Sequence, residues 1–126
     1  MTIRIEIDEA KGIAYIKVYG CLYESDIRQA FKSVISSSDY KKGMYRLWDL
    51  SEADLSTIDN ASLESLAKVS ADYSPEMDRT KVAVVAPQDL EFGMMRVYER
   101  ISERKDYLFS PFRTLAEAEK WLMTKE

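Results

Sequence analysis

The chain contains no histidine among its 126 residues. Histidine is the side chain whose unperturbed pKa lies near neutrality, and it is the commonest metal ligand in proteins. Its absence excludes Ser-His-Asp and Cys-His catalysis, most zinc sites and the two-histidine iron centre. An enzyme with this sequence would have to work with carboxylates, lysine or tyrosine, so the sequence favours a protein that is not an enzyme.

Cysteine, long apolar runs and an excess of positive charge are also scarce or missing. Cys21 is the only cysteine, so no internal disulfide can form and a reducing cytoplasm is the expected location. No apolar run approaches the ~18 residues of a membrane-spanning helix, and MTIRIEIDE at the start lacks the apolar core of a signal peptide. The net charge of −4, with both signs interspersed, argues against a nucleic-acid or anionic-membrane partner.

What is present indicates one α/β domain spanning residues 1–126. Alternating apolar residues predict strands, and apolar residues three and four apart predict helices. The strands are expected at 2–8, 13–19, 44–50, 81–86 and 106–110, and the helices at 25–35, 60–73, 87–101 and 114–122. The order β-β-α-β-α-β-α-β-α predicts an antiparallel hairpin followed by a mostly parallel five-stranded sheet with right-handed crossovers.

The helix expected over 87–101 carries apolar residues on more than one side. The set assigned to the core is Leu90, Met94, Val97, Tyr98 and Ile101. Phe92, Gly93 and Met95, together with Tyr98, form a second set that is a candidate apolar ligand groove or dimer face. Glycine inside a helix suggests close approach of another backbone or a ligand, and methionine adapts to binding surfaces. Packing of this second set under neighbouring segments is the equally weighted alternative.

A strand, a polar loop and a helix start follow one another in 46-RLWDLSEADLSTIDNASLESLAK-68. This arrangement is typical of anion sites and phosphate switches, because helix N-termini present free N–H groups. The candidate residues of such a site are Asp49, Ser51, Asp59, Asn60 and Ser62. The carboxylates match no metal-binding loop, so solvated charges and a helix-dipole role for Asp59 are favoured, and no metal or cofactor is predicted.

Three stretches of the chain carry a family resemblance. They are the strand and helix start just quoted, 82-VAVVAPQDLEFGMMRVYE-99, and 107-YLFSPFRTLAEAEKWL-122. Together they resemble the SpoIIAA-like branch of the STAS superfamily, which includes anti-sigma-factor antagonists. The resemblance implies the SpoIIAA-like fold and a cytoplasmic regulatory or binding role. It also implies a switch at an Asp-Ser pair, whose serine is phosphorylated by a partner kinase.

The chain departs from this family pattern at the switch itself. Asp59 falls on the aspartate of the pair and Asn60 falls on the serine. Asparagine cannot be phosphorylated, but it is a good N-cap, so Asn60 is expected to cap the following helix. Ser62, Ser56 and Thr57 remain alternative phosphate acceptors if the match is displaced by a few residues.

The function predicted from the sequence is therefore a non-catalytic cytoplasmic module that binds an unknown protein partner and self-associates as a homodimer. One alternative is a carrier or sensor of a small apolar, lipid-like ligand. It rests on the aromatic and methionine content of 92–98. A second alternative is a carboxylate-based hydrolase or phosphotransferase that uses Asp49 or Asp59.

Overall fold

The structure is a computed structural model, and it describes residues 2–41, 43–77, 80–101 and 107–124. Within these ranges the elements follow the order β-β-α-β-α-β-α-β-α, which confirms the predicted fold class. In chain order they are β1 (Thr2–Asp8), β2 (Ile13–Cys21), α1 (Glu24–Ser36), β3 (Tyr45–Asp54), α2 (Asn60–Met77), β4 (Thr80–Val85), α3 (Asp89–Ile101), β5 (Tyr107–Phe112) and α4 (Leu115–Met123).

The strands of the described ranges form one sheet, whose spatial order β1-β2-β3-β4-β5 is also the chain order. β1 and β2 are antiparallel, while β2, β3, β4 and β5 run parallel to one another, as predicted. The β1–β2 hairpin closes at Gly12, whose N–H donates to the carbonyl oxygen of Asp8 at 2.8 Å. Gly12 has a φ of 69°, a left-handed conformation that glycine adopts without steric strain.

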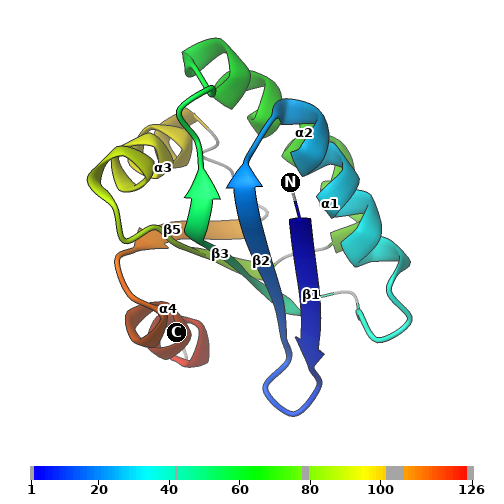
Figure 1. Cartoon of the computed structure of the whole chain (residues 1–126). Helices are drawn as coiled ribbons and strands as arrows, with labels where there is room; N and C mark the ends of the chain where they lie inside the picture. The colour runs from blue at the N-terminus through cyan, green and yellow to red at the C-terminus, as the bar shows by residue number, and fades with distance from the viewer. Residues whose placement is uncertain (1, 42, 78–79, 102–106, 125–126) are drawn as a thin grey trace.

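Within the described ranges, helices cover both faces of the sheet, with α1, α2 and α3 on one side and α4 on the other. Successive residues of a strand point to opposite faces, so Leu47 and Trp48 of β3 belong to two different cores. The larger core lies between the sheet and α1, α2 and α3. In this core the ring centroids of Phe31 and Trp48 are 5.5 Å apart. The smaller core contains Leu47 and Leu122 of α4. Figure 1 shows α4 set apart from the other three helices.

β3 extends four residues beyond the predicted strand 44–50, which corrects that boundary. Lys17 of β2 pairs with Asp49, but Tyr19 pairs with Glu52, so β3 holds one more residue than β2 over this step. An extra residue of this kind is a β-bulge, and it shifts the alternation of side chains along the strand. As a result, Leu50 before the extra residue and Ala53 after it both lie in the larger core.

α2 also extends past its predicted end. The predicted end at residue 73 was wrong, because the helix continues through Pro75 to Met77. Proline cannot donate the backbone hydrogen bond of its turn, and this usually weakens a helix. Near the end of α2 the loss of one such bond does not terminate the helix.

The predicted core face of α3 was wrong in part. Three residues assigned to the core are exposed, namely Leu90, Val97 and Ile101. The buried residues of α3 are instead Glu91 and Met95. The predicted and the observed buried residues differ by one position along the chain, which is a rotation of about 100° around the helix axis. The spacing of apolar residues alone does not determine this rotation. On the inner side, Met95 packs in the larger core and the carboxylate of Glu91 accepts the N–H of Leu55 at 3.4 Å.

α4 begins as its sequence predicts. Thr114 is the N-cap, and its hydroxyl oxygen accepts the N–H of Glu117 at 3.2 Å. The hydroxyl also donates to the carboxylate of Glu117 at 2.9 Å. The Thr-x-x-Glu pair therefore fixes the first turn of α4 at the end of β5.

Candidate functional site

The carboxyl edge of the sheet gathers the polar residues that the sequence singled out around α2. β2 and β3 end side by side there, because the N–H of Leu22 donates to the carbonyl oxygen of Asp54 at 3.0 Å. The hydroxyl of Thr57 donates to the carbonyl oxygen of Leu22 at 3.2 Å and lies 3.8 Å from the sulfur of Cys21. In open α/β sheets this edge is where ligands commonly bind.

The loop between β3 and α2 is held by its own residues. Leu55 and Ile58 are buried in the larger core, and the N–H of Ile58 donates to the carbonyl oxygen of Leu55 at 3.0 Å. The carboxylate of Asp54 accepts the N–H of Ser56 at 2.9 Å. The loop thus turns its apolar side chains inward and presents Asp54, Ser56 and Thr57 to solvent.

Asp59 is the N-cap of α2, which corrects the expectation that Asn60 has this role. Its carboxylate accepts the N–H of Ser62 at 2.8 Å, and Asn60 is the first helical residue. Both residue types cap well, so propensity does not distinguish them. The position is set by Ile58 and Leu63, which flank the cap and are both buried in the larger core, as in a hydrophobic staple.

The two aspartates of this loop are stabilised in their ionised form. Hydrogen bonds from the backbone and side chain of Ser62 lower the pKa of Asp59. Hydrogen bonds from the side chain and backbone of Ser56 lower the pKa of Asp54. Both carboxylates are exposed, so the loop presents fixed negative charge at neutral pH.

Carboxylates also occupy the first turns of the neighbouring helices. Asp26 of α1 accepts the N–H of Tyr23 at 2.9 Å, and Glu91 of α3 accepts the N–H of Leu55. Glu91 is only 5% exposed, and within the described part of the chain its second carboxylate oxygen has no hydrogen-bond partner. Because α1, α2 and α3 all begin beside an acidic side chain, this edge is electrostatically suited to a cationic group rather than to an anion.

The five residues proposed for an anion site do not all come together. Asp59, Asn60 and Ser62 lie at the start of α2. Asp49 and Ser51 lie within β3, where the carboxylate of Asp49 accepts the N–H of Ser51 at 2.9 Å beside the bulge. Asp49 also faces Lys17 at 3.9 Å across a hollow of about 200 Å³ on the α4 side of the sheet. Its carboxylate therefore supports the strand irregularity and is directed away from α2.

The four residues proposed for an apolar groove are also divided. Met95 and Tyr98 line a cavity. Phe92 is half-buried, and its ring centroid lies 4.2 Å from the guanidinium carbon of Arg113. Gly93 is exposed, and a Cβ built on it would meet no atom within 4 Å, so none of the described segments closely approaches it.

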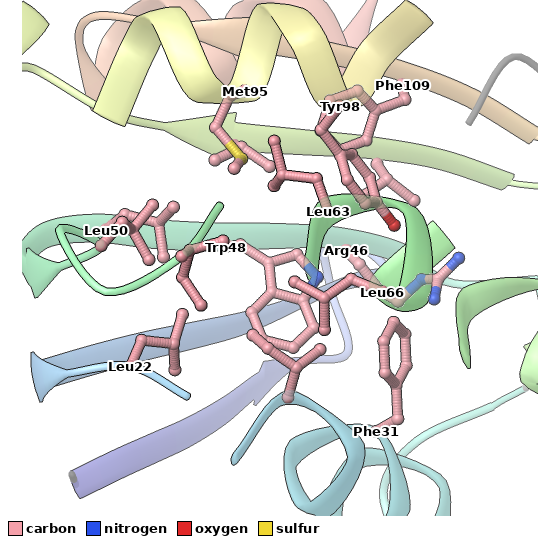
Figure 2. A pocket seen from close by; sticks show the side chains of 15 residues that line it. Leu22, Phe31, Arg46, Trp48, Leu50, Leu63, Leu66, Met95, Tyr98 and Phe109 are labelled. Carbon is pink, nitrogen blue, oxygen red and sulfur yellow. The ribbon is translucent and has the colours of Figure 1, made fainter. Parts of the chain in front are cut away.

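This cavity lies between the sheet and the helices of the larger core, is partly open to solvent, and has a volume of about 70 Å³. Its lining is mostly apolar, with polar groups on Arg46, Trp48 and Tyr98, and comprises Leu22, Ile27, Phe31, Arg46, Trp48, Leu50, Leu55, Ile58, Leu63, Leu66, Val82, Val84, Met95, Tyr98 and Phe109. Figure 2 shows the polar ends of Arg46 and Tyr98 at one end and Leu22 and Leu50 at the other. The sequence gives no sign that Arg46 lies at this cavity, because it is the one cation of β3 and its neighbours Leu47 and Trp48 are apolar.

Among the described residues, no three histidine, cysteine, aspartate or glutamate side chains gather in a way that could hold a metal ion. Within the same ranges no helix has the length and apolarity needed to cross a bilayer.

No protein-family model and no functionally curated protein matches the chain. Solved structures do match. An uncharacterised protein of the DUF3478 family with a SpoIIAA-like fold, from Shewanella loihica PV-4, is 21% identical with a TM-score of 0.62, over 96% of this chain and 92% of that one. An anti-sigma factor antagonist from Mycobacterium paratuberculosis is 17% identical with a TM-score of 0.61, over 98% and 94% of the two chains. The chain thus has the SpoIIAA-like fold that its sequence resemblance predicted.

Proposed function

We propose that this chain is a non-catalytic cytoplasmic regulatory module that binds a protein partner through the α2 edge, without a phosphoserine switch. The α2 edge is the exposed surface made by Asp54, Ser56, Thr57, Asp59 and Asn60. The shared fold with an anti-sigma factor antagonist supports a regulatory role of this kind. The hydrogen-bonded loop supports it as well, because an ordered surface loses little conformational entropy on binding.

The observation that carries the proposal is the pairing of Asp59 and Asn60. Asp59 caps α2 with an ionised carboxylate, and Asn60, which has no hydroxyl, occupies the exposed first helical position. A phosphoserine at that point would add a charge near −2 beside the helix N-terminus. Here the negative charge is permanent, so recognition does not depend on a kinase.

The charge of the α2 edge defines the chemistry of the partner. Asp54 and Asp59 are exposed and ionised, and no basic side chain of the described residues forms an ion pair with either of them. A complementary surface carries lysine or arginine. Exposed charge pairs are screened by salt, so binding is expected to weaken as ionic strength rises.

Affinity purification of the tagged chain from its own host tests the proposal. Asp54→Lys combined with Asp59→Asn removes the negative charge while asparagine preserves the helix cap. Asp39→Lys is the matched control, because Asp39 is exposed in the α1–β3 connection at the opposite edge of the sheet. Wild type and the control should retain the same amount of partner. The double variant should retain at least about tenfold less, which is a loss typical of a disrupted charged interface. Equal retention by all three proteins would exclude the α2 edge.

Phosphorylation is tested separately on the same material. Intact mass measured under denaturing conditions is expected to show no covalent phosphate. A stoichiometric phosphate located at Ser56, Thr57 or Ser62 would show that this region is a working switch. The partner-binding part of the proposal would then require comparison of the two phosphorylation states.

The cavity favours binding of a small apolar ligand as a second candidate function. Its volume of about 70 Å³ is roughly half that of an engineered cavity that binds benzene at ~150 Å³. It therefore has room for a group smaller than benzene or for the end of a longer apolar molecule. The polar ends of Arg46 and Tyr98 lie at one end of the cavity. A longer lipid would require the helices to move apart.

Native mass spectrometry of gently purified protein tests this second candidate. A bound ligand would add mass that disappears on denaturation. Met95→Phe, which places a larger side chain in the cavity lining, should then remove that mass, and a thermal melt confirms that the variant is folded. Protein without added mass, or a ligand equally retained by Met95→Phe, would count against a ligand in this cavity.

A further inference from the structure

The outer side of α3 carries a row of apolar residues that the fold does not bury. Leu90 is 54% exposed, Val97 is 38% exposed and Ile101 is 37% exposed, while Met94 is half-buried between them. These four residues, here called the outer stripe, follow the spacing i, i+4, i+7 and i+11. This is the alternating three-and-four repeat of a helix that packs against another helix.

Gly93 lies beside the outer stripe, between Leu90 and Met94. It is exposed, and a Cβ at this position would meet no atom of the described residues within 4 Å. Glycine disfavours the helix relative to alanine, and packing within this molecule gives no reason for its presence. A helix from another molecule that crosses α3 closely would explain the glycine, because the missing side chain lets two backbones approach.

The charges at the two ends of α3 indicate how such a helix is oriented. The first turn carries Asp89 and the last turn carries Arg100. If a second α3 lies antiparallel to the first, Asp89 of each copy comes near Arg100 of the other, and the helix dipoles oppose one another. Asp89 already binds Arg113 at 2.6 Å, but its side chain is 96% exposed and can accept a second cation.

We infer that two copies of this chain pair through the outer stripes of their α3 helices, antiparallel and related by a two-fold axis. A two-fold contact requires one surface that is complementary to itself. The outer stripe meets this requirement, because antiparallel pairing places Met94 opposite Val97 and Leu90 opposite Ile101. Figure 1 shows α3 on the flank of the molecule, where a second copy can reach it.

This interface differs from the homodimer surface expected from the sequence. That surface included Met95 and Tyr98, which line the cavity. It also differs from the α2 edge, so self-association and partner binding are separable. Charge changes at Asp54 and Asp59 should leave the dimer intact, and loss of the dimer does not bear on the proposed function.

Sedimentation of the full chain over a concentration series tests the interface. The wild type should form a dimer, and Val97→Glu should raise its dissociation constant at least about tenfold by placing a charge in the centre of the stripe. Met123→Glu is the matched control, because Met123 is 54% exposed on α4 and should leave the dissociation constant unchanged. A wild type that stays monomeric up to about 1 mM, or a dimer insensitive to Val97→Glu, would overturn the inference.

Gly93→Ala provides a second test that does not depend on a destabilised variant. Alanine should raise the melting temperature of the monomer, because it favours the helix and meets no neighbouring atom. The same change should weaken the dimer by preventing close approach of the two helices. A variant that is more stable as a monomer and equally strong as a dimer would overturn the close crossing.

Discussion

The ammonium of Lys81 lies 2.7 Å from the carbonyl oxygen of Thr124 and 3.0 Å from that of Trp121. Lys81 is a buried residue of β4, and these carbonyls belong to the end of α4. A cation from the sheet thus satisfies backbone acceptors that a helix C-terminus leaves open, and it favours the helix dipole. The ammonium also lies 5.1 Å from the centroid of the Trp121 ring, which adds a cation–π contact.

Lys81→Met should lower the free energy of unfolding by about 2–3 kcal/mol, because it removes two part-buried hydrogen bonds from a charged donor. Urea denaturation measures the loss. Lys120→Met is the control, since Lys120 is exposed in the last turn of α4, and its effect should stay within about 0.5 kcal/mol. Equal effects of the two substitutions would show that Lys81 does not hold α4 to the sheet.

Asp59→Ala should lower the melting temperature by about 3 °C at neutral pH, because it removes the N-cap of α2. Asp59→Asn keeps an N-cap acceptor and should lower it less. Calorimetry of the three proteins measures both shifts. If alanine and asparagine proved equivalent, the hydrogen bond from Ser62 would not be a stabilising cap.

The stability contributed by ionised Asp59 should depend on pH in one direction. Its pKa in the folded protein lies below the ordinary value of 3.8 because of hydrogen bonds from Ser62. This contribution is complete above pH 3.8 and is lost as pH falls through the folded pKa. The difference in melting temperature between wild type and Asp59→Asn should therefore shrink below that pH, and a constant difference would contradict the assignment.

Tyr15→Phe should lower the free energy of unfolding by about 1 kcal/mol at neutral pH. The hydroxyl of Tyr15 donates to the carboxylate of Glu119 at 2.6 Å, which ties β2 to α4. Tyr19→Phe is the control on the same strand, and urea denaturation compares the two. Similar losses in both variants would indicate that the hydrogen bond to Glu119 contributes little.

Alkaline pH provides a second measure of the Tyr15 contact. Burial and the hydrogen bond to Glu119 raise the pKa of Tyr15 above its ordinary value of 10. The folded state then retains a proton that the unfolded chain loses, so this stabilisation is complete below pH 10 and declines as pH rises towards the folded pKa. The difference in the free energy of unfolding between wild type and Tyr15→Phe should therefore narrow above pH 10. A difference that widens would contradict a raised pKa of Tyr15 in the folded state.

Leu63→Ala should lower the free energy of unfolding by about 3 kcal/mol, because Leu63 is fully buried in the wall of the cavity. The enlarged cavity should also bind benzene, detected as a rise in melting temperature of the variant but not of wild type. Leu108→Ala is the control, because Leu108 is an exposed leucine of β5. A loss near that of the control would mean that the core collapses around the deleted side chain.

The sequence predicted the strands and the order of elements well, because the apolar patterns of β1 and β4 are unambiguous. It failed on α3, where the more apolar side of the helix is exposed and the inner side carries Glu91, whose carboxylate contacts Leu55. Leu55 precedes Glu91 by 36 residues, so no local pattern contains this information.

The candidate site was predicted in part. The start of α2 was located correctly, but the cap moved from Asn60 to Asp59, because burial of Ile58 and Leu63 sets the turn. The buried cations Arg46 and Lys81 were not recognised, since each stands in an apolar strand and contacts residues distant in sequence. Partners of this kind become apparent only once the layers are assembled.

The agreement between spatial order and chain order in the sheet has a consequence for synthesis. Each new strand is added at the edge left open by the previous one, so no later strand must enter between two that are already paired. The nascent chain can therefore extend its sheet from β1 towards β5 as it leaves the ribosome. Until β5 has been synthesised, β4 is the edge strand of the sheet, and its unpaired backbone and apolar side chains can promote aggregation of the nascent chain.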